Sequence, residues 1–307
     1  MEHLDILTPL YLLIVLGFFL RKYKFPSIEF WPAIERMTYY VLFPTLIFVA
    51  LLKAPVDFAM IGKIAIIILI PVLVSGACQW LGFLSPNLSK ATFTSMFQGA
   101  VRNNTAISLV IASWLVPTNG LAIMAVVMLI MIPAVNVMSV LILLKYGDET
   151  GATPPTMWAG ILKNPLIVAC ILGLLFNLLG ISLPTSIIGT AEFLGRSALP
   201  FSLLAVGAGL KFNSVLGNKL AISLSSTTRL LLTPLLCWML CLALNIEVDI
   251  AKVAIIFCSM PTAVSSYILA RQLGGDAEGM AQIITLQTTL AAFTLPIFLI
   301  IVQQYGI

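Results

Sequence analysis

Ten apolar runs follow one another along the chain and are separated by short connections. A membrane-spanning helix needs about 17 to 25 mainly apolar residues. The runs that meet this length are 4–20, 33–52, 60–81, 88–116, 120–144, 157–181, 185–210, 220–244, 250–270 and 277–303. The longest connection, 145–156, is too short to form a soluble domain. The sequence therefore predicts an all-α polytopic membrane protein with ten transmembrane helices.

The residue types inside these runs exclude several classes of protein. Charged residues make up 9% of the chain, against about 25% in soluble proteins. The single histidine, His3, lies near the N-terminus, all twelve Asp and Glu lie in or near the connections, and all five cysteines lie inside apolar runs. An enzyme usually needs a nucleophile with a base, or a metal site. We therefore expect no enzyme, no cofactor, no metal site and no nucleic-acid partner.

Lysine and arginine predict the orientation of the chain, because they concentrate in cytoplasmic connections. One set of alternate connections carries Arg21, Lys22, Lys24, Lys90, Lys145, Lys163, Lys211, Lys219 and Arg271. The other set carries chiefly Lys53, Lys63 and Lys252, with Arg196 near the start of a run. The first set is predicted to be cytoplasmic. Both termini of this multi-pass cell-membrane protein are then extracytoplasmic.

The ten runs divide into two halves of five, 1–152 and 153–307. Several residues recur at an offset of 156, namely Pro9 and Pro165, Gly17 and Gly173, Pro44 and Pro200, and Lys63 and Lys219. Because each half has an odd number of runs, the second half enters the membrane from the opposite side. The sequence therefore predicts two inverted five-helix repeats, which suit alternating access.

Polar residues interrupt the fourth and the ninth run, at corresponding places in the two halves. The fourth run contains Arg102 followed by three polar residues, and the ninth contains Pro261, which removes a helical hydrogen bond. Interrupted spans at corresponding positions indicate a transport site. The N-terminus of each resulting half-helix would favour an anion.

Arg102 lies near the membrane midplane, about 14 residues after Leu88. A charge at that depth is costly and indicates a functional site. The alternative is a structural arginine that binds backbone carbonyls at the break. No acidic residue lies deep in a run, so an organic anion is favoured as substrate over a cation. The candidate substrate-binding residues are Arg102, Asn103, Asn104, Thr105, Asn136, Pro261, Ser265 and Tyr267.

The coupling ion stays open between Na⁺ and H⁺. Side-chain oxygens that could form a sodium or polar site belong to Gln98, Gln287, Thr288 and Thr289. Serine and threonine in membrane helices also bond their own helix or a neighbouring one. A second deep charge, Arg229, is expected to tie two helices together or to extend toward the cytoplasmic surface.

Motifs along nearly the whole chain resemble the auxin efflux carrier (AEC) family. They are LTPLYLLIVLGFFLRK, QGAVRNNTAISL, KNPLIVACILGLL, LPFSLLAVGAGL and MPTAVSSYILARQLGGDAEGMAQIITLQTTLAAFTLPIFLIIV. Bacterial members of this family are usually described as malate, malonate or auxin permeases. The resemblance implies that helices 4 and 9 are broken and crossed. It also implies that helices 1, 2, 6 and 7 form a scaffold, often dimeric, and that helices 3–5 and 8–10 form a mobile transport domain.

The resemblance extends to single positions in both interrupted runs. Plant auxin carriers have a Pro-Asn-Thr step in the first interruption, where this chain has Asn103, Asn104 and Thr105. It implies substrate recognition by Asn104, and Pro261 matches the family proline of the second interruption. The expected function is secondary active transport of an organic carboxylate by an elevator-type mechanism. Alternatives are a sodium-coupled symporter of the bile-acid type and an anion channel.

Overall fold

The computed structural model describes residues 2–53, 58–86, 88–147, 165–210 and 218–304, and this part of the chain contains no strand. The helices of the first half are α1 (Glu2–Lys22), α2 (Phe30–Met37), α3 (Phe43–Leu52), α4 (Phe58–Phe83), α5 (Lys90–Val101), α6 (Thr105–Leu115) and α7 (Gly120–Tyr146). Those of the second half are α9 (Pro165–Leu178), α10 (Thr185–Gly209), α11 (Lys219–Thr227), α12 (Thr233–Ala243), α13 (Val248–Cys258), α14 (Ser265–Gln272) and α15 (Ala277–Gln304). Two π-helical turns, η1 (Thr38–Leu42) and η2 (Thr228–Leu232), join α2 to α3 and α11 to α12.

Helices that are long and apolar enough to cross a membrane occur in both halves. Five such helices lie within the described residues, at Phe30–Leu52, Ile61–Phe83, Gly120–Tyr146, Lys219–Ala243 and Ala277–Val302. The fourth and ninth apolar runs are not among them, since each is divided into two short helices. The start of the 157–181 run, the 145–156 connection beyond Gly147 and the boundary at 152/153 lie outside the described residues. The prediction of an all-helical polytopic membrane protein is confirmed.

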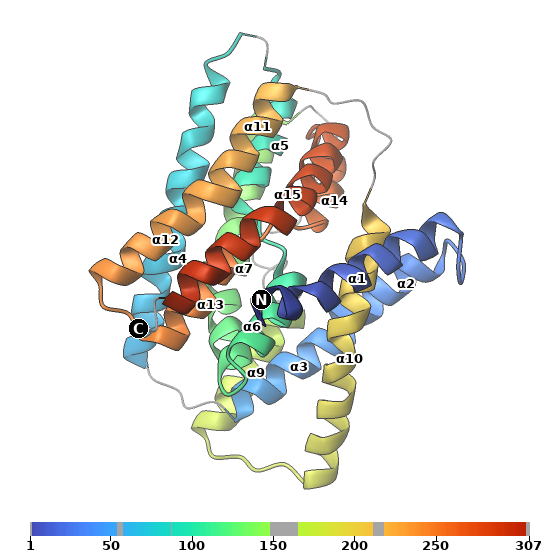
Figure 1. The fold of residues 1–307 in the computed structure, drawn as a ribbon, viewed down its shortest axis with the longest axis vertical. Coiled ribbons are helices and arrows are strands. Elements are labelled where there is room, and N and C mark those ends of the chain that lie inside the picture. Colours follow the sequence, from blue (N-terminus) through green and yellow to red (C-terminus); the bar gives the residue numbers. More distant parts are fainter. Residues whose placement is uncertain (1, 54–57, 87, 148–164, 211–217, 305–307) are drawn as a thin grey trace.

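The helices form two groups (Figure 1). The first group consists of α1, α2, α3, α9 and α10, toward the lower right of the view. Here α1 packs on α10 and α3 packs on α9 and α10. A Cβ atom at Gly17 of α1 would lie 2.0 Å from the carbonyl oxygen of Leu204, and one at Gly207 of α10 would lie 1.8 Å from that of Ile14. Glycine on both sides therefore allows the two backbones to approach closely.

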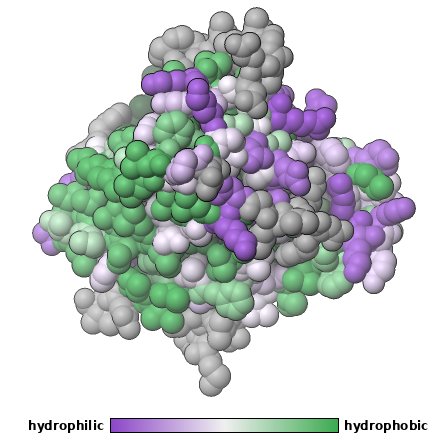
Figure 2. Space-filling view, turned by 90° about the horizontal axis from the view of Figure 1, so that it is seen from above, coloured by the Kyte–Doolittle hydropathy of each residue, from purple (hydrophilic) through white to green (hydrophobic). Residues whose placement is uncertain are grey.

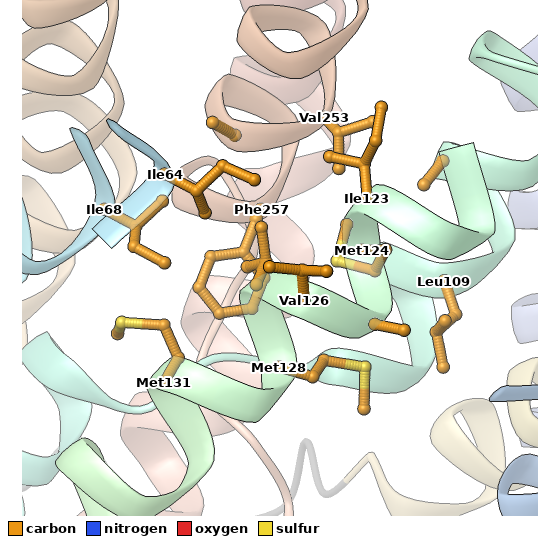
Figure 3. Close-up of a cluster of buried hydrophobic side chains, with 14 of the residues drawn as sticks. Ile64, Ile68, Leu109, Ile123, Met124, Val126, Met128, Met131, Val253 and Phe257 are labelled. Carbon is orange, nitrogen blue, oxygen red and sulfur yellow. The ribbon is translucent and has the colours of Figure 1, made fainter. Parts of the chain in front are cut away.

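The second group consists of α4–α7 and α11–α15. Its core includes the contact between α4, α7 and α13 drawn in Figure 3, where Phe257 lies among Ile64, Ile68 and Met131. Phe257 is 1% exposed and lies one residue before the end of α13. Its packing therefore holds the end of α13 in place.

The predicted interruptions of the fourth and ninth runs are present and touch each other. The chain leaves the helix after Val101 and resumes it at Thr105, and it leaves the helix again after Cys258 and resumes it at Ser265. The backbone N–H of Asn104 donates to the carbonyl oxygen of Pro261 at 2.8 Å. We call this meeting point the crossover.

The first interruption forms without a proline. The side-chain oxygen of Asn104 accepts a hydrogen bond from the N–H of Ile107 at 3.3 Å, so Asn104 is the N-cap of α6. Asparagine is among the strongest N-caps. The backbone of Arg102 is extended, with ψ 136°, as it leaves α5. A good N-cap and an extended residue are thus sufficient to end one helix and begin another.

Large apolar side chains are exposed on the surface of both helix groups. Figure 2 shows apolar side chains over the left part of the view, while hydrophilic side chains gather toward its right. Phe193 of α10 is 84% exposed and Phe293 of α15 is 71% exposed. Water-soluble proteins rarely expose so many large apolar side chains. Such a surface suits contact with lipid chains.

Candidate functional site

Arg102 lies at the crossover and is 9% exposed. Its Nη1 atom donates to Oδ1 of Asn136 in α7 at 2.8 Å, and Nη2 donates to Oγ of Ser265 in α14 at 3.1 Å. Both partners are neutral, and Nε has no hydrogen-bond partner within the described residues. The ion pair formed in that part of the chain joins Lys53 to Glu192 and does not involve Arg102. The guanidinium therefore presents an uncompensated, largely desolvated positive charge.

A cavity of about 80 Å³ lies beside this guanidinium, and we call it the crossover cavity. It is lined by Tyr39, Arg102, Asn103, Thr105, Met131, Ile132, Val135, Asn136, Leu166, Phe257, Ala263 and Ser265. Tyr39 comes from η1 and Leu166 from α9, both in the first helix group, while the other residues come from the second group. The cavity therefore lies between the two groups of helices.

Arg229 of η2 has the other deep charge, and it binds the backbone of the second interruption. Its Nε donates to the carbonyl oxygen of Met260 at 2.8 Å, and its Nη2 donates to that of Phe257 at 3.3 Å. The carbonyl of Phe257 also accepts from Nδ2 of Asn103 at 2.8 Å. Arg229 is 0% exposed, so it ties two helices together and does not extend to the surface.

Gln287 of α15 joins the two interruptions. Its Oε1 accepts from the N–H of Thr262 at 3.0 Å, and its Nε2 donates to the carbonyl oxygen of Gly99 at 3.0 Å. The Thr262 hydroxyl lies 2.6 Å from the Gly99 carbonyl oxygen and 2.7 Å from Gln287 Oε1, either of which it can donate to. These bonds satisfy backbone groups that the two breaks leave without helical partners.

The structure brings together some of the predicted binding residues and places others elsewhere. Five of them line the crossover cavity, namely Arg102, Asn103, Thr105, Asn136 and Ser265. Asn104 caps α6 and is 4% exposed, and Pro261 accepts the backbone hydrogen bond of Asn104. Tyr267 of α14 packs with Ile222 and Met280 in a separate apolar cluster.

The four residues of the predicted sodium or polar site have different surroundings. Thr288 and Thr289 donate to carbonyl oxygens of their own helix, at Ile284 and Thr285. Gln287 is engaged by the two interruptions. Gln98 of α5 is 0% exposed, and both polar atoms of its amide lack a partner in the described part of the chain.

Sequence reasoning did not identify several residues of the site. Tyr39 and Leu166 line the cavity from helices that have no polar interruption, so no local pattern marks them. Gln287 is one of the predicted sodium or polar ligands, and its contacts with the backbone of the two interruptions are not marked by any local pattern. Arg229 could be recognised as a deep charge, but its carbonyl partners lie 28 and 31 residues away.

An all-helical membrane protein with two broken helices, which meet at a buried cationic cavity, belongs to the class of membrane transporters. Residues 4–299 match the family model described as membrane transport protein. The chain therefore belongs to this family, the AEC family that its motifs resemble. Its members are transporters and not enzymes.

A protein of Methanothermobacter thermautotrophicus described as an uncharacterized transporter is also similar to this chain. The two sequences are 30% identical over 138 residues. The match covers 45% of this chain and 45% of that protein, so it spans about half of the relative's length.

Proposed function

We propose that the protein is a secondary active transporter that moves an organic carboxylate anion across the cell membrane. The observation that carries this proposal is the Arg102 guanidinium, held at the crossover by the neutral side chains of Asn136 and Ser265. A buried cation that pairs with no acidic side chain in the described part of the chain attracts an anion strongly, because water screens it little. The helices α6 and α14 also begin at this cavity, with Thr105 and Ser265 in its lining, and helix N-termini favour negative charge.

The proposed architecture has ten spans in two inverted repeats, 1–152 and 153–307, with both termini extracytoplasmic. The helix contacts support this arrangement. A contact between two runs recurs between the corresponding runs of the other half. The first run contacts the seventh through α1 and α10, and the sixth contacts the second through α9 and α3. Likewise α5 packs on α15, and α13 packs on α7.

The proposed mechanism is of the elevator type. In this mechanism α1–α3, α9 and α10 form the scaffold, and α4–α7 with α11–α15 form the transport domain. The scaffold also provides the surface through which a homodimer would form. The position of the crossover cavity supports this division, since Tyr39 and Leu166 belong to the scaffold and Arg102 to the transport domain. A carboxylate bound there would lie at the sliding surface between the two.

The size of the crossover cavity favours a small substrate. Its volume of about 80 Å³ is well below the roughly 300–1,000 Å³ of sites for larger organic ligands. A dicarboxylate such as malonate or malate fits this volume better than an indole acid does. Malonate is therefore the first substrate to test.

A sodium-coupled organic anion symporter of the bile-acid type is the second candidate, and Gln98 favours it. The amide of Gln98 lies one helical turn before Arg102, and its oxygen, which has no partner among the described residues, is the kind of atom that coordinates Na⁺. Under this alternative, carboxylate uptake requires Na⁺ and does not respond to a pH gradient. Under proton coupling, carboxylate uptake responds to a pH gradient and does not require Na⁺.

The test is uptake of malonate, malate and indole-3-acetate into proteoliposomes. We expect Arg102→Gln to reduce carboxylate uptake by about 10- to 100-fold, the effect of losing a charge-assisted hydrogen bond of about 1.5–3 kcal/mol. Arg271→Gln is the matched control, because Arg271 is an exposed arginine in the last turn of the half-helix that begins at Ser265, and it does not line the crossover cavity. Unchanged uptake in Arg102→Gln would show that this arginine has no part in the mechanism. Single-channel currents would show that the protein is an anion channel and not a transporter.

A further inference from the structure

A second and larger cavity lies beside the scaffold, and we call it the outer cavity. Its volume is about 310 Å³. It is lined by Leu46, Val49, Ala50, Lys53, Pro117, Thr118, Asn119, Leu121, Ala122, Glu192 and Arg196. The scaffold helices α3 and α10 provide one side, and the connection from α6 to α7 with the start of α7 provides the other.

The outer cavity has one negative and two positive side chains. Lys53, the residue that ends α3, forms an ion pair with Glu192 of α10. Arg196 follows Glu192 by one turn of α10, is exposed, and takes part in no ion pair within the described residues. The three side chains sum to a charge of +1. The cavity lining therefore has a net positive charge.

This positive charge is not accounted for by membrane orientation. Lysine and arginine gather in cytoplasmic connections, and most of those in this chain belong to the predicted cytoplasmic set. Lys53 and Arg196 belong to the opposite, sparsely charged side. The positive-inside rule therefore does not explain why these two charges line the outer cavity.

The crossover cavity and the outer cavity lie one after the other along the same scaffold segment, η1 and α3. Tyr39 lines the crossover cavity, and Leu46, Val49 and Lys53 line the outer cavity. Leu46, Val49 and Lys53 are spaced by three and four positions, which places them on one face of α3, and Tyr39 lies in the π-helical turn that precedes α3. At about 1.5 Å per residue, Leu46 lies roughly 10 Å further along the helix than Tyr39.

The transport domain follows the same path. Helix α6 begins with Thr105 at the crossover cavity, and Pro117 at the outer cavity follows shortly after its end. Helix α6 has eleven residues and a length of about 16 Å, and it spans the distance between the two cavities. Both cavities therefore lie at the surface between scaffold and transport domain, at two depths.

We propose that the outer cavity is a second binding site for the carboxylate substrate, on the extracytoplasmic side of the crossover. Lys53 and Arg196 contact the carboxylate, and Glu192 competes with it for Lys53. A cavity of this volume holds a small organic ligand, and its positive charge raises the local concentration of anions. This inference rests on the proposed function, because it takes its ligand class from the crossover cavity.

The kinetic test measures malonate uptake separately from each face of the membrane. Lys53→Gln and Arg196→Gln are expected to raise the half-saturation concentration at the extracytoplasmic face by about threefold or more, with little change in maximal rate. Glu192→Gln is expected to lower it, because Lys53 then loses its competitor. Lys63→Gln is the matched control, since it removes an exposed charge from the same side without touching the cavity.

A binding measurement separates failure of this site from failure of the proposed function. In the Arg102→Gln background, saturating malonate is expected to raise the melting temperature of the purified protein, because a ligand stabilises the state that binds it. Adding Lys53→Gln or Arg196→Gln should abolish this rise, and Glu192→Gln should increase it. If Arg102→Gln shows no malonate-dependent rise, the outer site is refuted even when the wild-type protein transports. If the rise is present and the wild-type protein transports no carboxylate, the proposed function fails, and the outer cavity remains a carboxylate-binding site without a role in transport.

Discussion

The two interruptions of the membrane helices each have a deeply buried arginine, but the two arginines have different partners. Arg102, in the first interruption, binds a side-chain amide and a hydroxyl beside a cavity. Arg229 comes from a neighbouring helix and binds two backbone carbonyls of the second interruption, at Met260 and Phe257. Carbonyls at the end of a broken helix need donors for the fold to form. A guanidinium bound to neutral side chains at the edge of a cavity remains able to bind a ligand.

The largest expected difference between the two arginines is in stability. Arg229→Gln removes two charge-assisted hydrogen bonds of about 1.5–3 kcal/mol each. We therefore expect the free energy of unfolding to fall by about 3 kcal/mol or more. Arg102→Gln should change the free energy of unfolding by about 1 kcal/mol or less, because its partners Asn136 and Ser265 line the crossover cavity, where water can replace the guanidinium. Thermal unfolding of both variants in the same detergent measures this difference. Equal melting of the two would show that the division between structural and ligand-binding arginine is wrong.

Gln287 provides a weaker test, because its bonds join the two interruptions without any charge. Gln287→Leu loses the bonds to the Thr262 N–H and the Gly99 carbonyl, each contributing about 0.5–1.5 kcal/mol. We expect the free energy of unfolding to fall by about 1–3 kcal/mol. Uptake should also fall, since the two interruptions are then held together less firmly. Thr288→Val is the matched control on α15, as its hydroxyl donates to the carbonyl oxygen of Ile284 in the same helix. A Gln287→Leu protein as stable as Thr288→Val would contradict this assignment.

Asn104 gives the smallest expected effect and tests the role that the family resemblance implies for it. Asn104→Ser keeps a side-chain N-cap for α6, so the stability should stay within about 0.5 kcal/mol of wild type. Because the Asn104 side chain caps the helix and does not line the crossover cavity, we expect an unchanged half-saturation concentration for malonate. A rise of several-fold at unchanged stability would instead support direct substrate recognition by this side chain.

The sequence predicts the helical class and both interruptions, because their causes are local. Pro261 cannot donate a helical hydrogen bond, and the run from Arg102 to Thr105 is too polar for an uninterrupted span in lipid. Five of the eight candidate binding residues line the crossover cavity; four of them, Arg102, Asn103, Thr105 and Ser265, lie at the two breaks, and Asn136 lies in α7.

The remaining features depend on contacts between distant parts of the chain. Gln287 and Gly99 are 188 residues apart, and Asn103 and Phe257 are 154 residues apart. Nothing near either residue of such a pair marks its partner. Leu166 and the outer cavity were missed for the same reason, because packing between helices creates them.

The hydrogen bond between the Asn104 N–H and the Pro261 carbonyl has a consequence for the diversification of such proteins. It joins main-chain atoms, so it survives replacement of the side chains around it. Selection can therefore vary residues 102, 136 and 265 and so change which molecule is carried, while the backbone that holds them stays in register. A library randomised at these three positions should retain a high fraction of folded members, which makes the crossover a suitable place to redesign selectivity.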